Sequence, residues 1–143
     1  MSATAIDILE NVALAIESVG EFAEVSIGTR RTQGGLPRAS VELTEHTTRP
    51  ADDGVATWHR LRLTVAIVAA GAPQRLATYR AMQLCRTCQD ALQVDEFRAG
   101  LARHLPWGRA TQFGPTAVST SLKPPMCELL FEVICHYETA GDA

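Results

Sequence analysis

The four cysteines are the residues whose chemistry would be easiest to recognise. Cys85 and Cys88 have the spacing of a redox or zinc half-motif, but both fall on the apolar stripe of a predicted helix, about three turns from its start. A reactive dithiol needs a lowered thiol pKa, which a helix N-terminus or a neighbouring cation supplies. Cys127 and Cys135 share one predicted strand roughly 26 Å apart, so they cannot complete a tetrahedral site with the first pair. We therefore expect buried structural thiols, with no bound metal or cofactor.

Histidines and carboxylates give no stronger sign of catalysis. The four histidines are scattered along the chain, at His46, His59, His104 and His136. None has the HExxH or H-x3-5-H spacing of a metal site. Glu128 and Glu132 share one face of a predicted strand about 13 Å apart, which exceeds the carboxylate separation in glycosidases. Pairing of these acids with Arg60 and Arg62 across a sheet is the simpler interpretation, and we expect no catalytic residue.

Phosphate binding is one alternative that the arginines leave open. Arg30, Arg31, Arg38 and Arg49 would contact phosphate from one end of the sheet, in contacts that are blind to sequence and sensitive to salt. The chain has no interleaved aromatic platform for single-stranded nucleic acid, and its net charge is -3. A nucleic-acid-associated accessory protein stays open as an alternative, whereas a specific nucleic-acid reader is not expected.

Charge is distributed unevenly along the chain. Residues 1–27 carry five acids and no base, residues 28–123 carry all 13 Lys and Arg, and residues 124–143 carry four acids and no base. Every base except Lys123 is Arg, whose planar guanidinium suits interfaces and bidentate ion pairs. Ordinary solvated faces explain this pattern. An acidic surface that meets an arginine-rich surface on a neighbouring subunit explains it as well.

Hydrophobic periodicity predicts the elements that position these residues. Spacings of three and four indicate helices, and alternation indicates strands. The predicted helices cover residues 4–19 and 76–92, and the predicted strands cover 24–28, 38–46, 58–69, 116–122 and 126–137. We expect the first two strands to form a hairpin, residues 47–57 to form a long loop, and Asp95 to cap a further short helix. Residues 107–115 read as irregular, and residues 123–125 as a turn.

Short connections between these elements favour an α+β fold. We expect a single domain with a mostly antiparallel four- to five-stranded sheet packed with two main helices, in the order α-β-β-loop-β-α-β-β. The domain would span residues 1–143, with its core at about 4–138 and a flexible tail at 139–143. The longest nearly uncharged stretch, residues 63–73, is shorter than the roughly 20 residues of a membrane span. No basic region precedes the first acids, so we expect neither a signal peptide nor a disulfide framework.

The order of these elements resembles that of the tail terminator and tail-completion (head–tail joining) proteins of tailed bacteriophages. The resemblance covers residues 4–138, and it is carried by the strands EVSIG and RASVELTEH, the loop TTRPADDGVAT, the strand WHRLRLTVAIVAA and the helix QRLATYRAMQLCRTCQDAL. It implies a non-catalytic virion structural protein that forms a ring, commonly hexameric, which caps the tail tube and docks on the head-side connector. It also implies assembly in the host cytoplasm, a place in the tail or neck of the virion, and DNA as a passing, non-specific cargo without a membrane partner.

The resemblance also indicates which residues would meet partners. The long loop and the hairpin at Gly34 and Gly35 would face the lumen or the axial partners. A ring needs two different patches that meet, so the acidic first helix or last strand would contact arginines of the next subunit. The candidate interface residues are Arg30, Arg31, Arg38, Arg49, Asp52, Asp53, Trp58, Arg60, Arg62, Arg75, Arg80, Glu128 and Glu132. The alternative is a small α+β ligand-binding or enzymatic domain with a site between the sheet and the long helix.

Overall fold

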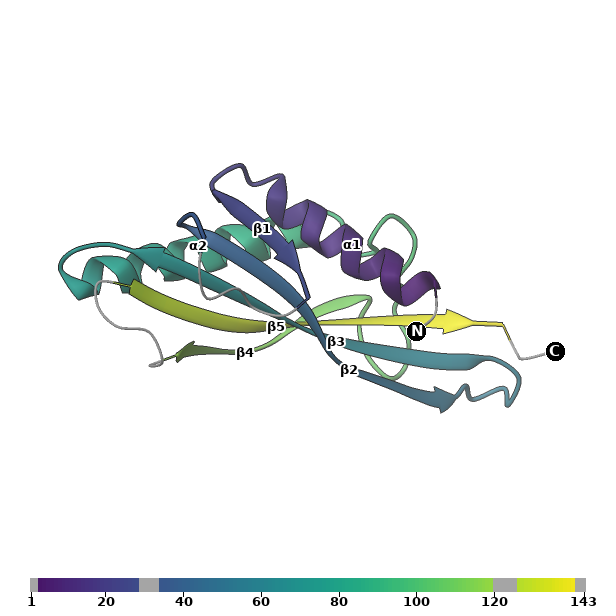
Figure 1. Cartoon of the computed structure of the whole chain (residues 1–143). Helices are drawn as coiled ribbons and strands as arrows, with labels where there is room; N and C mark the ends of the chain where they lie inside the picture. The colour runs from purple at the N-terminus through teal and green to yellow at the C-terminus, as the bar shows by residue number, and fades with distance from the viewer. Residues whose placement is uncertain (1–2, 29–33, 120–125, 141–143) are drawn as a thin grey trace.

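A mixed five-stranded sheet carries two helices in the part of the chain that the structure describes. The computed structural model describes residues 3–28, 34–119 and 126–140. Their elements are α1 (Ala3–Glu17), β1 (Glu24–Ile27), β2 (Arg38–Pro50), β3 (Thr57–Ala70), α2 (Gln74–Val94), β4 (Thr111–Ser119) and β5 (Met126–Thr139). The strands lie side by side in the order β1-β2-β3-β5-β4, and α1 and α2 pack against the sheet (Figure 1). The predicted α+β class and element order are confirmed.

β1 runs parallel to β2, whereas the sequence predicts a hairpin. Glu24 pairs with Arg38 in a parallel register that continues along all four residues of β1. A tight turn would impose the antiparallel direction, but the connection here is residues 28–37. Ten residues can span up to about 33 Å, more than twice the length of a four-residue strand, so the connection is long enough for parallel pairing. Gly28 N donates to the Val41 carbonyl at 2.8 Å and closes the pair.

The hairpin of β2 and β3 is longer than the sequence predicts. Residues 47–50 are expected in a loop but continue β2, where Thr47 pairs with Arg60 and Arg49 with Trp58. β-branched threonines favour the extended conformation. β1 pairs only with residues 38–41 of β2, so Pro50 lies where β2 has β3 as its one neighbour, and a proline is tolerated at such an edge. The turn is reduced to residues 51–56. It lies at the tip of the hairpin, which extends past the N-terminal end of α1 in Figure 1.

The core lies between the sheet and the helices. Leu61, Leu63, Val65 and Ile67 alternate along β3 and are fully buried. The residues that β5 and the helices pack against them include Leu129, Phe131, Val133, Ile8, Val12, Ile16, Ala77, Ala81 and Leu92. Full burial of an aliphatic side chain of this size contributes about 1.5–3 kcal/mol, so contact between these layers is the main source of stability. The expected alternation in β3 and β5 is confirmed, as is burial of both faces of β3 near its end.

The segment after α2 forms turns in place of the short helix that the sequence predicts. Residues 95–101 are turns, and Arg98 and Ala99 have positive φ values of 49° and 57°, which a right-handed helix does not accommodate. The carboxylate of Asp95 accepts a hydrogen bond from Ala99 N at 2.7 Å. Arg98 is 1% exposed, and its guanidinium donates to carbonyls at the end of α2 and to Asn11 Oδ1 at 3.2 Å. This buried arginine holds the turns against both described helices.

β4 begins at Thr111, five residues earlier than the sequence predicts. A bulge between Phe113 and Thr116, which contains Pro115, interrupts the alternation from which a strand would be recognised. β4 pairs with β5 and forms one outer edge of the sheet.

The C-terminal expectations are met in part. β5 continues to Thr139, so this residue belongs to the sheet and not to the expected tail. Residues 120–122 of the predicted strand 116–122 and the turn expected at residues 123–125 lie outside the described residues, as do residues 141–143. Neither α1 nor α2, the helices of the described chain, is long and apolar enough to cross a membrane.

Candidate functional site

The cysteine thiols are free and buried. Cys85 and Cys88 face the core from the middle of α2, and Cys127 and Cys135 face it from β5. Burial raises the pKa of Cys85, and it raises the pKa of Cys88 to about 12 and that of Cys135 to about 11. A thiol that stays protonated at neutral pH is a poor nucleophile and a poor metal ligand. Across the described residues, no three His, Cys, Asp or Glu side chains form a group that could hold a metal ion.

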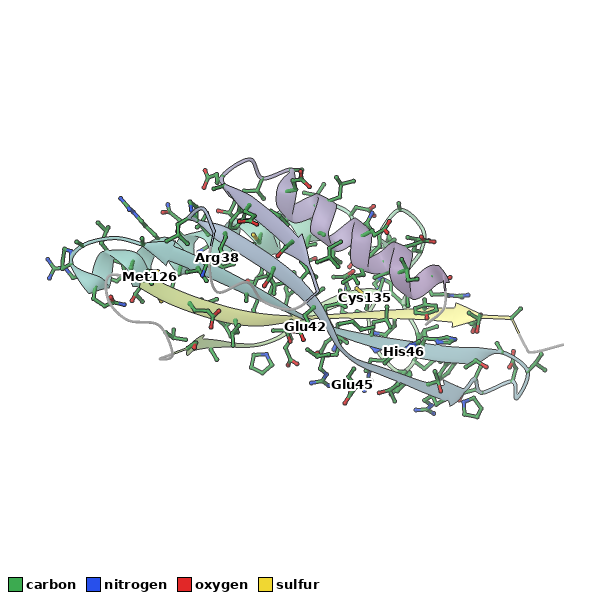
Figure 2. The ribbon with its side chains drawn as sticks, viewed as in Figure 1. Arg38, Glu42, Glu45, His46, Met126 and Cys135 are labelled. Carbon is green, nitrogen blue, oxygen red and sulfur yellow. The ribbon has the colours of Figure 1, made fainter. Side chains whose placement is uncertain are left out.

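The face of the sheet opposite α1 and α2, which we call the polar face, holds most of the candidate residues. Successive residues of a strand point to opposite faces, so Glu45 lies on the polar face while its neighbour His46 lies on the helix side (Figure 2). On this face the register forms three rows, each with one residue from β2, one from β3 and one from β5. The first row is Glu45, Arg62 and Ile134, the second is Thr47, Arg60 and His136, and the third is Arg49, Trp58 and Glu138.

Arg60 is held within the chain by three contacts. Its Nε donates to His136 Nε2 at 2.9 Å, and its Nη2 donates to the Trp107 carbonyl at 3.0 Å. Its guanidinium lies 4.2 Å from the centre of the Trp107 ring, a cation–π contact. Since Arg60 donates to Nε2, the His136 proton belongs on Nδ1, which donates to the Arg109 carbonyl at 2.6 Å. Burial lowers the pKa of His136, in keeping with this neutral ring.

Trp58 and Arg49 contact each other at the hairpin end of the polar face. Trp58 is 5% exposed, and its Nε1 donates to Glu138 Oε2 at 2.8 Å. The Arg49 guanidinium lies 5.4 Å from the Trp58 ring and 5.5 Å from the Trp107 ring. Arg49 therefore joins two indole rings that come from segments far apart in the sequence.

Arg62 forms the charge pair that the sequence predicts. Its Nη1 lies 3.2 Å from Glu132, and its Nε lies 3.7 Å from Glu45. The expected pairing of acids with both arginines of β3 is therefore confirmed for Arg62. It is wrong for Arg60, which takes a histidine partner because the register aligns it with His136.

Arg38 and Glu128 lie at the other end of the polar face, each 6% exposed. Among the described residues, Nε of Arg38 has no hydrogen-bond partner. Arg38 and Arg49 sit eleven positions apart in β2, a separation of about 36 Å along an extended strand. The expected phosphate contact by both from one end of the sheet is therefore wrong. Arg30 and Arg31 lie outside the described residues.

The turn between β2 and β3 presents an acidic pair. Oδ1 of Asp53 accepts hydrogen bonds from Val55 N at 2.7 Å and Ala56 N at 3.0 Å, and these bonds lower the pKa of Asp53. Gly54 supplies the left-handed conformation of the turn, with a φ of 71°. Asp52 is exposed, and Val55 is 69% exposed. The tip of the hairpin therefore offers negative charge beside an apolar side chain.

The arginines of α2 differ in their surroundings. Arg80 donates to the Ala70 carbonyl at 2.9 Å, beside a hollow of about 340 Å³ that Glu21 also lines. Arg75 is exposed, and so is Arg86, which the sequence does not single out. Arg75 and Arg86 are thus available to a partner.

A histidine cluster that the sequence does not predict lies on the helix side of the sheet. His46 Nε2 lies 2.9 Å from His59 Nδ1, and the His59 ring stacks on Tyr137 with ring centres 4.3 Å apart. Nε2 of His59 lies 2.8 Å from Thr139 Oγ1. Burial lowers the pKa of both histidines, and the charge of His46 adds to this effect at His59. The place of His59 on the apolar side of its strand is the sequence signal for this cluster.

Comparison with known proteins gives a likeness in fold. No protein-family model matches the sequence, and no curated protein matches it. A chain of a solved structure described as "Virion of native gene transfer agent (GTA) particle" is similar, with a TM-score of 0.51. The two chains are 14% identical, and the match covers 97% of this chain and 100% of that chain.

Proposed function

We propose that the protein is a non-catalytic structural subunit of a phage-like virion. The observation that carries this proposal is the likeness in fold to a chain of a gene transfer agent virion over nearly the whole length of both chains. Burial of the cysteine thiols supports a structural role, since it removes the most reactive side chains from solvent. The internal partners of Arg60 and Arg62 support it too, since these cations are already used within the fold.

In finer terms, we propose a tail terminator. The subunit would form a homo-oligomeric ring, a hexamer, that caps the tail tube and joins it to the head-side connector in the tail or neck of the virion. The resemblance in element order supports this assignment. The tip of the β2–β3 hairpin is the proposed axial contact, because it extends past the N-terminal end of α1 and presents exposed Asp52 and Val55 (Figure 1). Loops that extend from a rigid scaffold commonly carry contacts with partners.

Assembly is the direct test of the ring. The purified chain at low salt should give a light-scattering mass of about six subunits, the stoichiometry of a closed cyclic ring, and rings of uniform diameter in negative-stain images. A monomeric mass at low salt and high protein concentration would contradict the proposal. Gold-labelled antibody against this chain should then mark one end of the tail tube in intact particles. Label along the whole tube or on the head would contradict the terminal position.

A further inference from the structure

We propose that one exposed stripe of α1 docks on one exposed stripe of α2 in a second copy of this chain. That the chain assembles with itself is taken from the proposed function, and the inference adds which surfaces meet. We call them the acidic stripe, which is Asp7, Glu10, Leu14 and Glu17, and the basic stripe, which is Arg75, Tyr79, Met82 and Arg86.

The acidic stripe follows one side of α1. Its residues recur at spacings of three and four, which places them on the same side of a helix. All of them are exposed, and Leu14, near the middle of the stripe, is 65% exposed. α1 contains three acids and no base. No ion pair within the described residues uses Asp7, Glu10 or Glu17.

The basic stripe has the complementary composition on α2. Arg75 and Arg86 stand at its two ends, and neither forms an ion pair with another described residue. Tyr79 and Met82 lie between them and are 61% and 53% exposed. The two side chains lie on neighbouring turns and together form an apolar strip that is open to a partner.

The two stripes match in length and in pattern. At about 1.5 Å per residue, the acidic stripe is about 15 Å long and the basic stripe about 17 Å. Each stripe has charge at both ends and a large apolar side chain near its middle. When the helices lie side by side, Leu14 of one copy packs against Tyr79 and Met82 of the next, while acids and arginines pair at the ends. The apolar centre provides burial, and the charges provide selectivity and a faster encounter.

The placement of the helices makes the contact run from one copy to the next. Both helices lie on the same face of the sheet. α1 contacts β1 and β2, towards the β1 edge, whereas α2 contacts β3 and β5, towards the β4 edge (Figure 1). The two stripes therefore lie on different flanks of the helical layer, and Leu14 also lines a hollow with Ala91 and Val94 of α2. Joining two different flanks produces a head-to-tail interface, which closes into a ring when the rotation between copies allows it.

A charge-reversal experiment with full-length protein tests the interface. The variant Glu10→Lys/Glu17→Lys makes the acidic stripe basic, and Arg75→Glu/Arg86→Glu makes the basic stripe acidic. Each variant alone should need at least about tenfold more protein for half-assembly, because like charges then face each other. An equal mixture of the two should assemble again, since each altered stripe meets an oppositely charged one. The double variant Glu42→Lys/Glu45→Lys reverses two acids of β2 that belong to neither stripe, and it should assemble as the wild type does.

The outcomes separate this inference from the proposed function. If the wild type assembles and both reversal variants assemble equally well, the interface is wrong while the proposed ring stands. If the wild type stays monomeric, the ring itself is wrong. A wild-type dimer would overturn the head-to-tail arrangement. The four side chains altered in the two stripes are exposed, so circular dichroism and thermal unfolding of both reversal variants should match those of the wild type.

Discussion

His136 connects three separated segments of the chain through one side chain. Its two ring nitrogens bond to Arg60 in β3 and to the backbone of Arg109 before β4, and its edge contacts the Trp107 ring. It is fully buried although it lies on the face of the sheet opposite the helices. His136 therefore fixes the position of the irregular segment that precedes β4.

Gly108 should not accept a side chain, because a Cβ there would collide with the His136 ring. Gly108→Ala should lower the free energy of unfolding by about 1–3 kcal/mol, as expected for overpacking at a buried site. Chemical denaturation measures the loss. In the double variant with His136→Ala, the combined loss should be smaller than the sum of the single losses, and simple additivity would contradict the collision.

Three histidines make stability depend on pH. Burial holds the native pKa of His46, His59 and His136 below the ordinary value of about 6.5. Between the native and the ordinary pKa the unfolded chain binds more protons, so stability rises with pH in this window. The contribution of these histidines to the free energy of unfolding should be complete above about pH 6.5, and it should be lost as the pH falls through the native pKa values. Urea denaturation across this range measures it. A free energy of unfolding that does not change with pH in the wild type would contradict this prediction. A pH dependence in His59→Gln as steep as that of the wild type would mean that His59 does not contribute to it.

The buried thiols should not react with a small thiol reagent while the protein is folded. Native protein should react at none of its four cysteines on the timescale in which denatured protein reacts at all of them. A colorimetric thiol titration before and after adding denaturant gives both counts. Rapid reaction of Cys85 or Cys88 in native protein would favour the alternative of an enzymatic or ligand-binding domain.

At the scale of elements, the β2–β3 hairpin shows why one face of a strand cannot always be predicted from alternation. Ala39, Val41 and Leu43 alternate towards the core, as the sequence predicts. A bulge between Leu43 and Glu45 then shifts the alternation by one residue, so His46 points to the helix side. The place of His46 in the histidine cluster depends on this shift, and no local sequence signal marks the bulge.

The positions of the other elements could be predicted where the periodic pattern of apolar residues extended over many residues. β3 and the two helices have many alternating or periodic residues, and their positions agree with the sequence to within a few residues. The direction of β1 could not be predicted, because a four-residue strand with a ten-residue connection pairs in either direction. Candidate residues were easier to name than to place. Arg62 finds its predicted acid, whereas Trp58 is buried, and Arg86 of the basic stripe was missed because its charge alone did not distinguish it.

The β2–β3 turn should depend on Asp53 and not on Asp52. Asp53 accepts two backbone hydrogen bonds within the turn, whereas Asp52 is exposed. In Asp53→Ala, the amides of Val55 and Ala56 should exchange with solvent faster, as measured by NMR. Asp52→Ala is the matched control and should leave these two rates unchanged. Equal rates in both variants would mean that the turn is held by its other bonds.

At the scale of the whole molecule, charge is polarised across the helical layer. α1 carries acids alone among its charged residues, and α2 carries three arginines and one acid. This polarity is hidden in a net charge of -3.

Self-assembly should weaken with salt. The Debye length falls from about 10 Å at 0.1 M to about 3 Å at 1 M, so the pairs at the ends of the stripes are screened. Light scattering should show a lower mean mass at the higher salt concentration. Leu14→Ala removes apolar area, and should therefore reduce assembly at both concentrations. A mass that rises with salt would indicate an interface dominated by apolar contact.

The bulge in β4 has a consequence for how the chain behaves when it is crowded. β4 is an outer strand, and Pro115 removes one amide donor from it while the bulge bends its backbone. A strand from another molecule would meet an interrupted row of donors and acceptors there. Edge-to-edge growth into cross-β fibres is thereby disfavoured at this edge of the sheet.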